Sequence, residues 1–240
     1  METRFELKNV SKFYTKKITT GKKVRFAALD GINLTIYEKK INAVMGKSGS
    51  GKSTLARILL GLESCDRGEI IYKGANIDSI SKKEFRRKNQ VMFQNPFLSV
   101  NPYFKIQKIL SEPLIIDKRF NKKKIKEKMD QLLETLEIPG SFLNRYPSEL
   151  SGGQLQRIVL GRALILEPEF IILDEPFSSL DEIMTARLMR YFKKIFEQLG
   201  IGVLYISHHL KRIQFLADYI ALMEKGRVIQ HVTKEEFKDF

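Results

Sequence analysis

Eight consecutive residues in the first quarter of the chain have the composition of a phosphate-binding loop. The segment from Gly46 to Ser53 reads Gly-Lys-Ser-Gly-Ser-Gly-Lys-Ser and matches the pattern G-x-x-x-x-G-K-[ST]. Glycines let backbone N–H groups converge on phosphate oxygens at a helix N-terminus. In such a loop Lys52 holds the β- and γ-phosphates, and the Ser53 hydroxyl is a ligand of Mg²⁺. The predicted phosphate-binding site comprises Gly46, Lys47, Ser48, Gly49, Ser50, Gly51, Lys52, Ser53 and Thr54.

Two adjacent carboxylates follow a short apolar run. Residues 170–173 read Phe-Ile-Ile-Leu and lead directly into Asp174 and Glu175. In α/β sheets, ligands bind beyond the carboxyl ends of the strands. Asp174 would then hold Mg²⁺ through water, and Glu175 would act as general base or orient the attacking water. Acids at strand ends also cap helices, so this interpretation depends on the phosphate-binding loop.

A third segment, Leu150-Ser151-Gly152-Gly153-Gln154, places two glycines at the start of an expected helix. Glycines there cost stability unless the backbone must approach something closely. Because a helix N-terminus favours negative charge, we expect Ser151 and the amides after it to contact an anion. A phosphate-binding loop alone also fits kinases, GTPases and many motors, and the three segments in this order remove most of those alternatives.

The hydrophobic pattern predicts the elements that position the first loop. Ile41–Met45 is a buried strand running into the glycines, and residues 54–60 continue as a helix that Gly61 can terminate. Residues 5–7 and 32–36 alternate apolar with polar side chains. That alternation predicts an antiparallel edge sheet with a long loop between its strands.

The rest of the chain alternates between predicted helices and strands. Residues 95–147 are mainly helical, with turns at Asn-Pro and Pro-Gly pairs, and form an inserted lobe. A helix, a strand, a second helix, a second strand and a closing hairpin follow, at 154–165, 170–173, Glu182–Leu199, 203–207 and 219–230. This order indicates a parallel sheet covered on both faces.

Length and composition bound the class of protein. The 240 residues, 43% of them hydrophobic, can bury the core of one catalytic unit with an inserted lobe. Apolar runs are far shorter than the roughly 20 residues of a membrane span, and the N-terminus lacks the pattern of a secretory signal. We therefore expect a cytosolic chain. Its one cysteine, Cys65, forbids an internal disulfide.

The net charge of +14 raises nucleic acid or an anionic membrane surface as possible partners. The densest basic run, 118–128, leads into a helix with helically spaced apolar residues, so we interpret it as a solvated face. A second cluster at 82–88 lacks the interleaved aromatic residues of single-strand binders. Neither cluster indicates nucleic-acid binding, and we do not expect nucleic acid as a partner.

Together these motifs resemble the ATP-binding subunits of ABC transporters, and the resemblance covers nearly the whole chain. It implies a single ABC ATPase domain over residues 1–240, of α/β class. The implied fold is a P-loop NTPase (RecA-like) core with an N-terminal antiparallel β-subdomain and an inserted α-helical subdomain. Residues 1–94 and 154–240 would form the core, and 95–153 the helical subdomain. The pentapeptide 150–154 at its end matches the family's signature motif.

The resemblance also implies roles for single residues. In that family the signature motif of one subunit closes on ATP held by another, so Ser151 and Gly153 would act in trans, together with Gly152 and Gln154. Tyr14 matches an aromatic residue that stacks on adenine, although the adjacent Phe13 is an alternative.

Three further positions match family motifs. Gln94 matches a glutamine that touches Mg²⁺ and senses the membrane subunits. Asp181, in the segment 179–181, matches a loop through which paired subunits communicate. His208 matches the switch histidine at the γ-phosphate, whereas His209 stands where an acidic residue commonly follows. The catalytic set implied by the resemblance is Glu175, His208, Lys52 and Gln94.

Finer features are similar to those of the peptide and nickel uptake ATPases, in particular the nickel or metal-chelate branch. They are an extra loop at 15–23 and the segments 57–63, 95–102 and 112–114. In that group two different ATPase subunits usually pair.

The implied function is an importer motor, peripheral on the cytoplasmic face of the cell membrane. Its partners would be two transmembrane permease subunits, a second ATPase subunit and, through the permeases, an extracellular substrate-binding protein. An exporter or lipid-extraction ATPase, and a soluble ABC ATPase acting on ribosomes or nucleic acid, remain alternatives. A nucleotide sensor without hydrolysis is disfavoured because Lys52, Asp174, Glu175 and His208 are all present.

Overall fold

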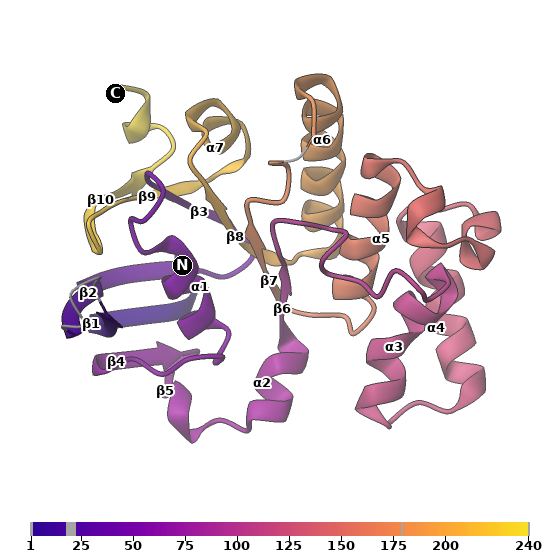
Figure 1. Ribbon diagram of the computed structural model, residues 1–240, viewed down its shortest axis with the longest axis horizontal. Helices are drawn as coiled ribbons and strands as arrows, with labels where there is room; N and C mark the ends of the chain where they lie inside the picture. The colour runs from indigo at the N-terminus through magenta and orange to yellow at the C-terminus, as the bar shows by residue number, and fades with distance from the viewer. Residues whose placement is uncertain (1, 18–22, 179, 240) are drawn as a thin grey trace. The chain divides into compact units, whose positions relative to one another are not determined.

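The computed structural model describes residues 2–17, 23–178 and 180–239 (Figure 1). The chain divides into two compact units, one formed by 1–86 with 202–240 and the other by 87–201. No helix in the described ranges is long and apolar enough to cross a membrane.

The first unit contains a four-stranded antiparallel sheet with the strand order β2-β1-β4-β5. Strands β1 (Thr3–Lys17) and β2 (Lys23–Tyr37) pair with β4 (Arg67–Tyr72) and β5 (Ala75–Asn76). The expected long loop between short strands is wrong, because β1 and β2 continue as paired strands of 15 residues each. Directly opposed pairs such as Tyr14 with Phe26 stabilise this extension. Residues 18–22 of the predicted extra loop lie outside the described residues.

A second group of strands in this unit includes the strand that leads into the phosphate-binding loop. Strand β3 (Ile41–Met45) is parallel to β8 (Gly202–Ser207) on one side and to β9 (Tyr219–Glu224) on the other. Strand β10 (Arg227–Thr233) completes the predicted hairpin with β9. Helix α1 (Lys52–Leu59) follows β3, and α7 (Leu210–Leu216) lies between β8 and β9. The 3₁₀ turns Ile77–Ser79 and Glu236–Asp239 follow β5 and β10.

The second unit combines a pair of parallel strands with four long helices. Strand β6 (Asn89–Met92) follows α2 (Lys82–Lys88) and pairs with β7 (Phe170–Asp174). The helices are α3 (Ile106–Asp117), α4 (Lys122–Thr135), α5 (Gly152–Leu164) and α6 (Glu182–Leu199). Short 3₁₀ turns at Gly140–Asn144 and Pro147–Glu149 precede α5.

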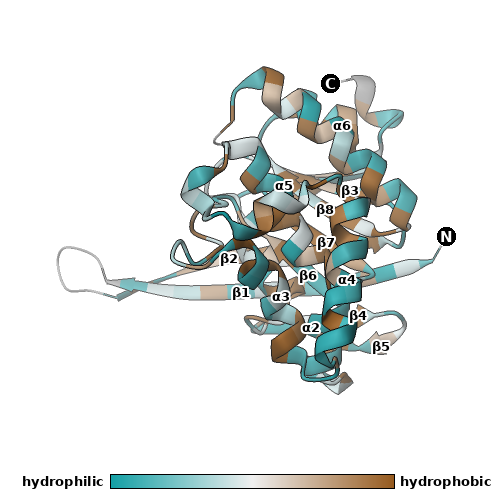
Figure 2. Ribbon diagram, turned by 90° about the vertical axis from the view of Figure 1, so that its right-hand side faces the viewer, coloured by the Kyte–Doolittle hydropathy of each residue, from teal (hydrophilic) through white to brown (hydrophobic). Residues whose placement is uncertain are grey.

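Helices α3, α4 and α5 pack around a glycine. A Cβ atom added to Gly161 of α5 would lie 3.0–3.3 Å from the side chains of Leu110, Leu132 and Leu136. Arg162, the next residue of α5, pairs with Glu112 of α3 at 2.9 Å. Only Met129 and Leu132 of α4 are buried, and the ribbon of this helix in Figure 2 carries both hydrophilic and hydrophobic residues. The basic start of α4 is thus largely solvated, as predicted.

Candidate functional site

The phosphate-binding loop of the first unit runs from the end of β3 into α1. Lys52, only 7% exposed, donates from Nζ to the carbonyl oxygens of Gly46 at 2.7 Å and Lys47 at 2.9 Å. The lysine ammonium therefore lies over the loop that is predicted to hold the phosphates. Ser50 and Thr54 are also buried, whereas Lys47, Ser48 and Gly49 are exposed.

Two of the loop's glycines are required by the surrounding backbone. A Cβ atom on Gly46 would lie 2.4 Å from the Met223 carbonyl oxygen. A Cβ atom on Gly51, whose φ is +105°, would lie 2.5 Å from the Ala28 carbonyl oxygen. No other residue fits these positions without a shift of backbone. Gly49 also has a positive φ, but a Cβ atom there would meet nothing within 4 Å.

His208 lies at the same strand edge as this loop. Strands β3 and β8 are parallel, and Met45 is the register partner of Ser207. The next residues, Gly46 and His208, are therefore brought together at the carboxyl ends of neighbouring strands. The rings of His208 and His209 lie 4.0 Å apart between centroids, and the backbone N–H of His209 donates to Ser207 Oγ.

Tyr14 and Phe13 point to opposite faces of β1. Tyr14 opposes Phe26, with ring centroids 6.0 Å apart, and its hydroxyl donates to Glu63 just beyond α1. Phe13 lies instead under the guanidinium groups of Arg25 and Arg67, at 4.3 and 5.6 Å from its ring centroid. Tyr14 therefore faces the side of the sheet where the phosphate-binding helix lies, and Phe13 does not.

In the second unit, the paired strands bring Gln94 to the same edge as the two carboxylates. Met92 at the end of β6 is the register partner of Leu173, so Gln94 and the pair Asp174 and Glu175 follow neighbouring strand ends. Glu175 has a φ of +50°, a conformation that costs a non-glycine residue about 1–3 kcal/mol and recurs at functional sites.

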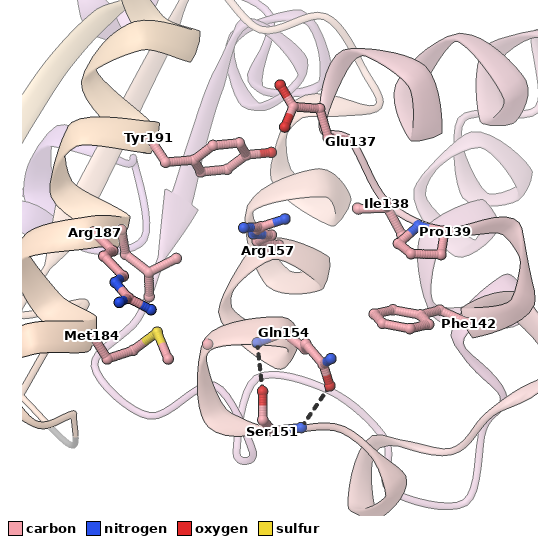
Figure 3. A pocket seen from close by; sticks show the side chains of 12 residues that line it. Glu137, Ile138, Pro139, Phe142, Ser151, Gln154, Arg157, Met184, Arg187 and Tyr191 are labelled. Atoms are coloured by element: carbon pink, nitrogen blue, oxygen red, sulfur yellow. Dashed lines mark hydrogen bonds between the residues drawn. The ribbon is translucent and has the colours of Figure 1, made fainter.

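The signature motif forms the N-terminal cap of α5 (Figure 3). Ser151 Oγ accepts from the Gln154 backbone N–H at 3.3 Å, and Gln154 Oε1 accepts from the Ser151 N–H at 2.9 Å. A Cβ atom on Gly152 would lie 3.1 Å from the Leu180 side chain, and one on Gly153 would lie 2.8 Å from Met184 Sδ. Close packing against these side chains is thus a reason for both glycines that the sequence did not reveal.

A hollow of about 360 Å³ opens beside this cap (Figure 3). Arg157 of α5 lies over the Tyr191 ring, at 4.7 Å from its centroid, and the Tyr191 hydroxyl donates to the Leu136 carbonyl oxygen at 2.6 Å. Burial raises the pKa of Tyr191 to about 12. The hollow is lined by Glu137, Ile138, Pro139, Phe142, Ser151, Gly153, Gln154, Arg157, Met184, Arg187, Leu188 and Tyr191.

Gln156, which sequence reasoning missed, connects the signature helix to the turn that holds Glu175. Its side chain is fully buried, and Nε2 donates to the Pro176 carbonyl oxygen at 2.6 Å. The sequence offered a weak signal, since Gln156 is a polar residue on the otherwise apolar buried face of α5.

Asp181 caps the N-terminus of α6, because Oδ1 accepts from the Met184 N–H at 2.8 Å. Its predicted part in communication between subunits stays a prediction. Ser179 of the same predicted loop lies outside the described residues.

Comparison with known proteins adds a family to this geometry. A family model described as ABC transporter matches residues 29–178. The dipeptide transport ATP-binding protein DppF of Haemophilus influenzae is 39% identical over 95% of this chain and 71% of its own length. The nickel import ATP-binding protein NikE of Shigella dysenteriae is 35% identical over 95% of this chain and 86% of its own length.

Solved structures agree. The ATP-binding cassette MJ0796, in a dimeric post-hydrolysis state with ADP and Pi, has a TM-score of 0.80 and 29% identity over 96% of this chain and 98% of its own. The cbiO1 protein of Clostridium perfringens, part of the ABC transporter complex cbiONQ, matches in fold with a TM-score of 0.84. It is 24% identical and covers 99% of this chain and 91% of its own. The family model and these relatives show that this chain belongs to the ABC transporter family.

Proposed function

We propose that this protein is the ATP-binding and ATP-hydrolysing motor subunit of an ABC importer that takes up peptides, nickel or another metal chelate. The observation that supports the proposal most is that Lys52, the loop glycines and His208 lie together at one strand edge of the first unit. Relatives named for dipeptide, oligopeptide and nickel transport support the substrate classes.

The first unit fits the triphosphate of ATP. Gly49 and Gly51 have positive φ values, a backbone conformation that occurs in the turns of known anion sites. In the proposal, Lys52 binds the β- and γ-phosphates, His208 binds the γ-phosphate, and Tyr14 stacks on adenine. Mg²⁺, when bound, neutralises charge on the phosphate oxygens, and the Ser53 hydroxyl is one of its ligands.

The second unit would provide the hydrolytic groups and the contact in trans. Glu175 would orient or deprotonate the attacking water, and Asp174, through water, and Gln94 would be the residues of this unit that hold Mg²⁺. The cap formed by Ser151 and Gln154 would bind the γ-phosphate of ATP held by a second subunit. The dimeric form of MJ0796 supports such an arrangement.

The proposed assembly contains two ATPase subunits and two transmembrane permeases at the cytoplasmic face of the membrane. A heterodimer of ATPases is the main expectation, and an extracellular binding protein would deliver the cargo. We also propose that residues 95–153 form the subdomain that contacts the permeases, with 1–94 and 154–240 as the core. Exposed apolar side chains at Phe97, Leu98 and Tyr103 support that contact surface.

The test is to purify tagged Glu175→Gln protein with ATP from membranes of its own cell and to identify what accompanies it. Recovery of a second ATPase and two permeases supports the importer, and their binding protein would identify the cargo. Ribosomes or nucleic acid would overturn the proposal, and permeases of an exporter would overturn its direction.

Lys52→Ala is the matched control. We expect this substitution to weaken nucleotide binding, whereas Glu175→Gln should keep binding and accumulate a dimer. The isolated wild-type chain should hydrolyse ATP slowly, at a rate that depends on its concentration. Equal wild-type turnover in both variants would contradict the site assignment.

A further inference from the structure

The loop that follows α1, residues 63–66, is hydrogen-bonded to β1 beside Tyr14. Lys12 Nζ donates to the Ser64 carbonyl oxygen at 2.7 Å and to Asp66 Oδ1 at 3.2 Å. Asp66 Oδ2 accepts from the Phe13 backbone N–H at 2.7 Å. The Tyr14 hydroxyl adds a bond to Glu63 Oε2 in the same loop. Both the backbone and the ring of this part of β1 are thus held by residues just beyond α1.

Glu63 is in turn fixed by α1. Arg57 Nε lies 2.7 Å from Glu63 Oε1, as a charge contact without the alignment of a hydrogen bond. An outer nitrogen of the same guanidinium reaches Thr54 Oγ1 at 3.4 Å, at the end of the phosphate-binding loop. The bond from the Tyr14 hydroxyl and the charge of Arg57 lower the pKa of Glu63, so its carboxylate is ionised at neutral pH. The tyrosine therefore donates to a charged acceptor, which is a strong class of hydrogen bond.

This connection restricts the Tyr14 ring before any base arrives. Its hydroxyl end is held by Glu63, and Phe26 packs beside it with the two rings tilted by 40°. An aromatic side chain that is already ordered loses less entropy when a ligand binds. The ring that is proposed to stack on adenine thus keeps a set orientation relative to α1.

We propose that Glu63, held by Arg57, is a positioning residue that fixes the Tyr14 ring for recognition of the nucleotide base. The inference rests on the proposed function of Tyr14. Helix α1 then positions the groups that bind both ends of the ligand. Its first residue, Lys52, holds the phosphates, and Arg57, about 7.5 Å further along the helix axis, holds Glu63 beside the base-binding ring. Base affinity is coupled to the phosphate loop through one helix.

The test measures Mg²⁺-dependent binding of two probes, ATP and inorganic tripolyphosphate, by calorimetry. Tyr14→Phe removes only the hydroxyl, and Glu63→Ala removes its acceptor. Each should raise the Kd for ATP about five- to tenfold and change the Kd for tripolyphosphate less than twofold. The double variant should be no weaker than either single one, because both remove the same bond. Glu63→Gln, which keeps an acceptor, should recover most of the affinity.

The other outcomes overturn the inference. If Glu63→Ala raises the Kd of both probes equally, Glu63 supports the phosphate loop rather than the ring. Additive losses of ATP affinity in the double variant would mean that Tyr14 and Glu63 act independently. If Glu63→Ala does not fold, Tyr14→Phe still decides the point, because an unchanged Kd for ATP in that variant would mean that the bond to Glu63 does not fix the ring. Failure of the proposed function gives a different result, in which the wild type binds ATP no more tightly than tripolyphosphate.

Discussion

The two glycine-containing loops of this protein are built in different ways. In the phosphate-binding loop, Gly46 and Gly51 press against backbone carbonyl oxygens of their own unit. In the signature motif, Gly152 and Gly153 press against the ends of two side chains, Leu180 and Met184. Backbone cannot move aside cheaply, whereas a methionine can change rotamer. The first loop is therefore fixed by its own unit, and the second can adjust to what binds it.

The largest effect should come from Gly51→Ala. Its Cβ atom would overlap the Ala28 carbonyl oxygen, in a backbone conformation that an alanine rarely adopts. We expect a loss of about 3 kcal/mol in the free energy of unfolding, measured by urea denaturation. Gly49→Ala is the control, with open space and only the positive φ to oppose it, and should cost about 1 kcal/mol. Equal losses would show that contact with Ala28 is not what fixes the loop.

Gln156→Met tests the connection between the signature helix and Glu175. The substitution keeps the size of the side chain but leaves the Pro176 carbonyl oxygen buried without its donor. We expect unfolding to be easier by about 2 kcal/mol, and ATP turnover to fall because the strained Glu175 turn loses support. The matched control is Gln131→Met on the exposed side of α4, which should change stability by less than about 0.5 kcal/mol. Identical behaviour of the two variants would refute the role of Gln156.

Gly153→Ala tests whether the signature motif is adjustable. Alanine gains about 1 kcal/mol over glycine in a helix, but its Cβ atom would lie 2.8 Å from Met184 Sδ. The two effects should nearly cancel in a thermal unfolding measurement. In a Met184→Ala background the clash is absent, so Gly153→Ala should then stabilise by about 1 kcal/mol. A large loss in both backgrounds would mean that this loop is as rigid as the first.

Acid should lower the stability of the first unit, and alkali should lower that of the second. In the first, burial beside Tyr37 and Tyr219 lowers the pKa of His231, so its contribution to stability is present above about pH 6.5 and is lost in acid. In the second, the raised pKa of Tyr191 gives a contribution that is present below pH 10 and is lost as the pH rises towards 12. The thermal midpoint of His231→Gln should vary less than that of the wild type between pH 5 and 8. The thermal midpoint of Tyr191→Phe should vary less than that of the wild type between pH 9 and 11.5. For Tyr191 the difference should stay below about 1 kcal/mol, since solvent screens a half-buried group.

Elements with clear ends were predictable from the sequence. Helix α6 has the predicted bounds because Asp181 caps its start and Gly200, with φ of +62°, ends it. Strand β3 also agrees, since its apolar residues run directly into the glycines. The outer half of β1 was missed because it ends in Tyr-Thr-Lys-Lys and shows no apolar alternation, and pairing with β2 holds it instead. Strand β6 was missed because it has four residues and starts with Asn89 and Gln90.

The candidate site also contains residues that the sequence predicted and residues that it did not. The motifs around Lys52, Ser151 and Asp174 are local in sequence, so residue types and spacing were enough to find them. Glu63 lies 49 residues from Tyr14, and Gln156 lies 20 residues from Pro176. No spacing rule predicts such partners, because only the packed fold brings them together. The roles of the site residues remain predictions that the experiments above address, and the boundaries at 94 and 153 remain predictions.

The long hairpin has a consequence for the behaviour of this protein in solution. Strand β2 forms the outer edge of its sheet, and residues 23–27 are exposed. Long edge strands can pair with strands of other chains and start aggregation, and charged side chains on the edge oppose this. Lys23 and Arg25 provide such charges, in a chain whose net charge is +14. High salt shortens the range of this repulsion, so the protein should remain dispersed best in buffers of low ionic strength.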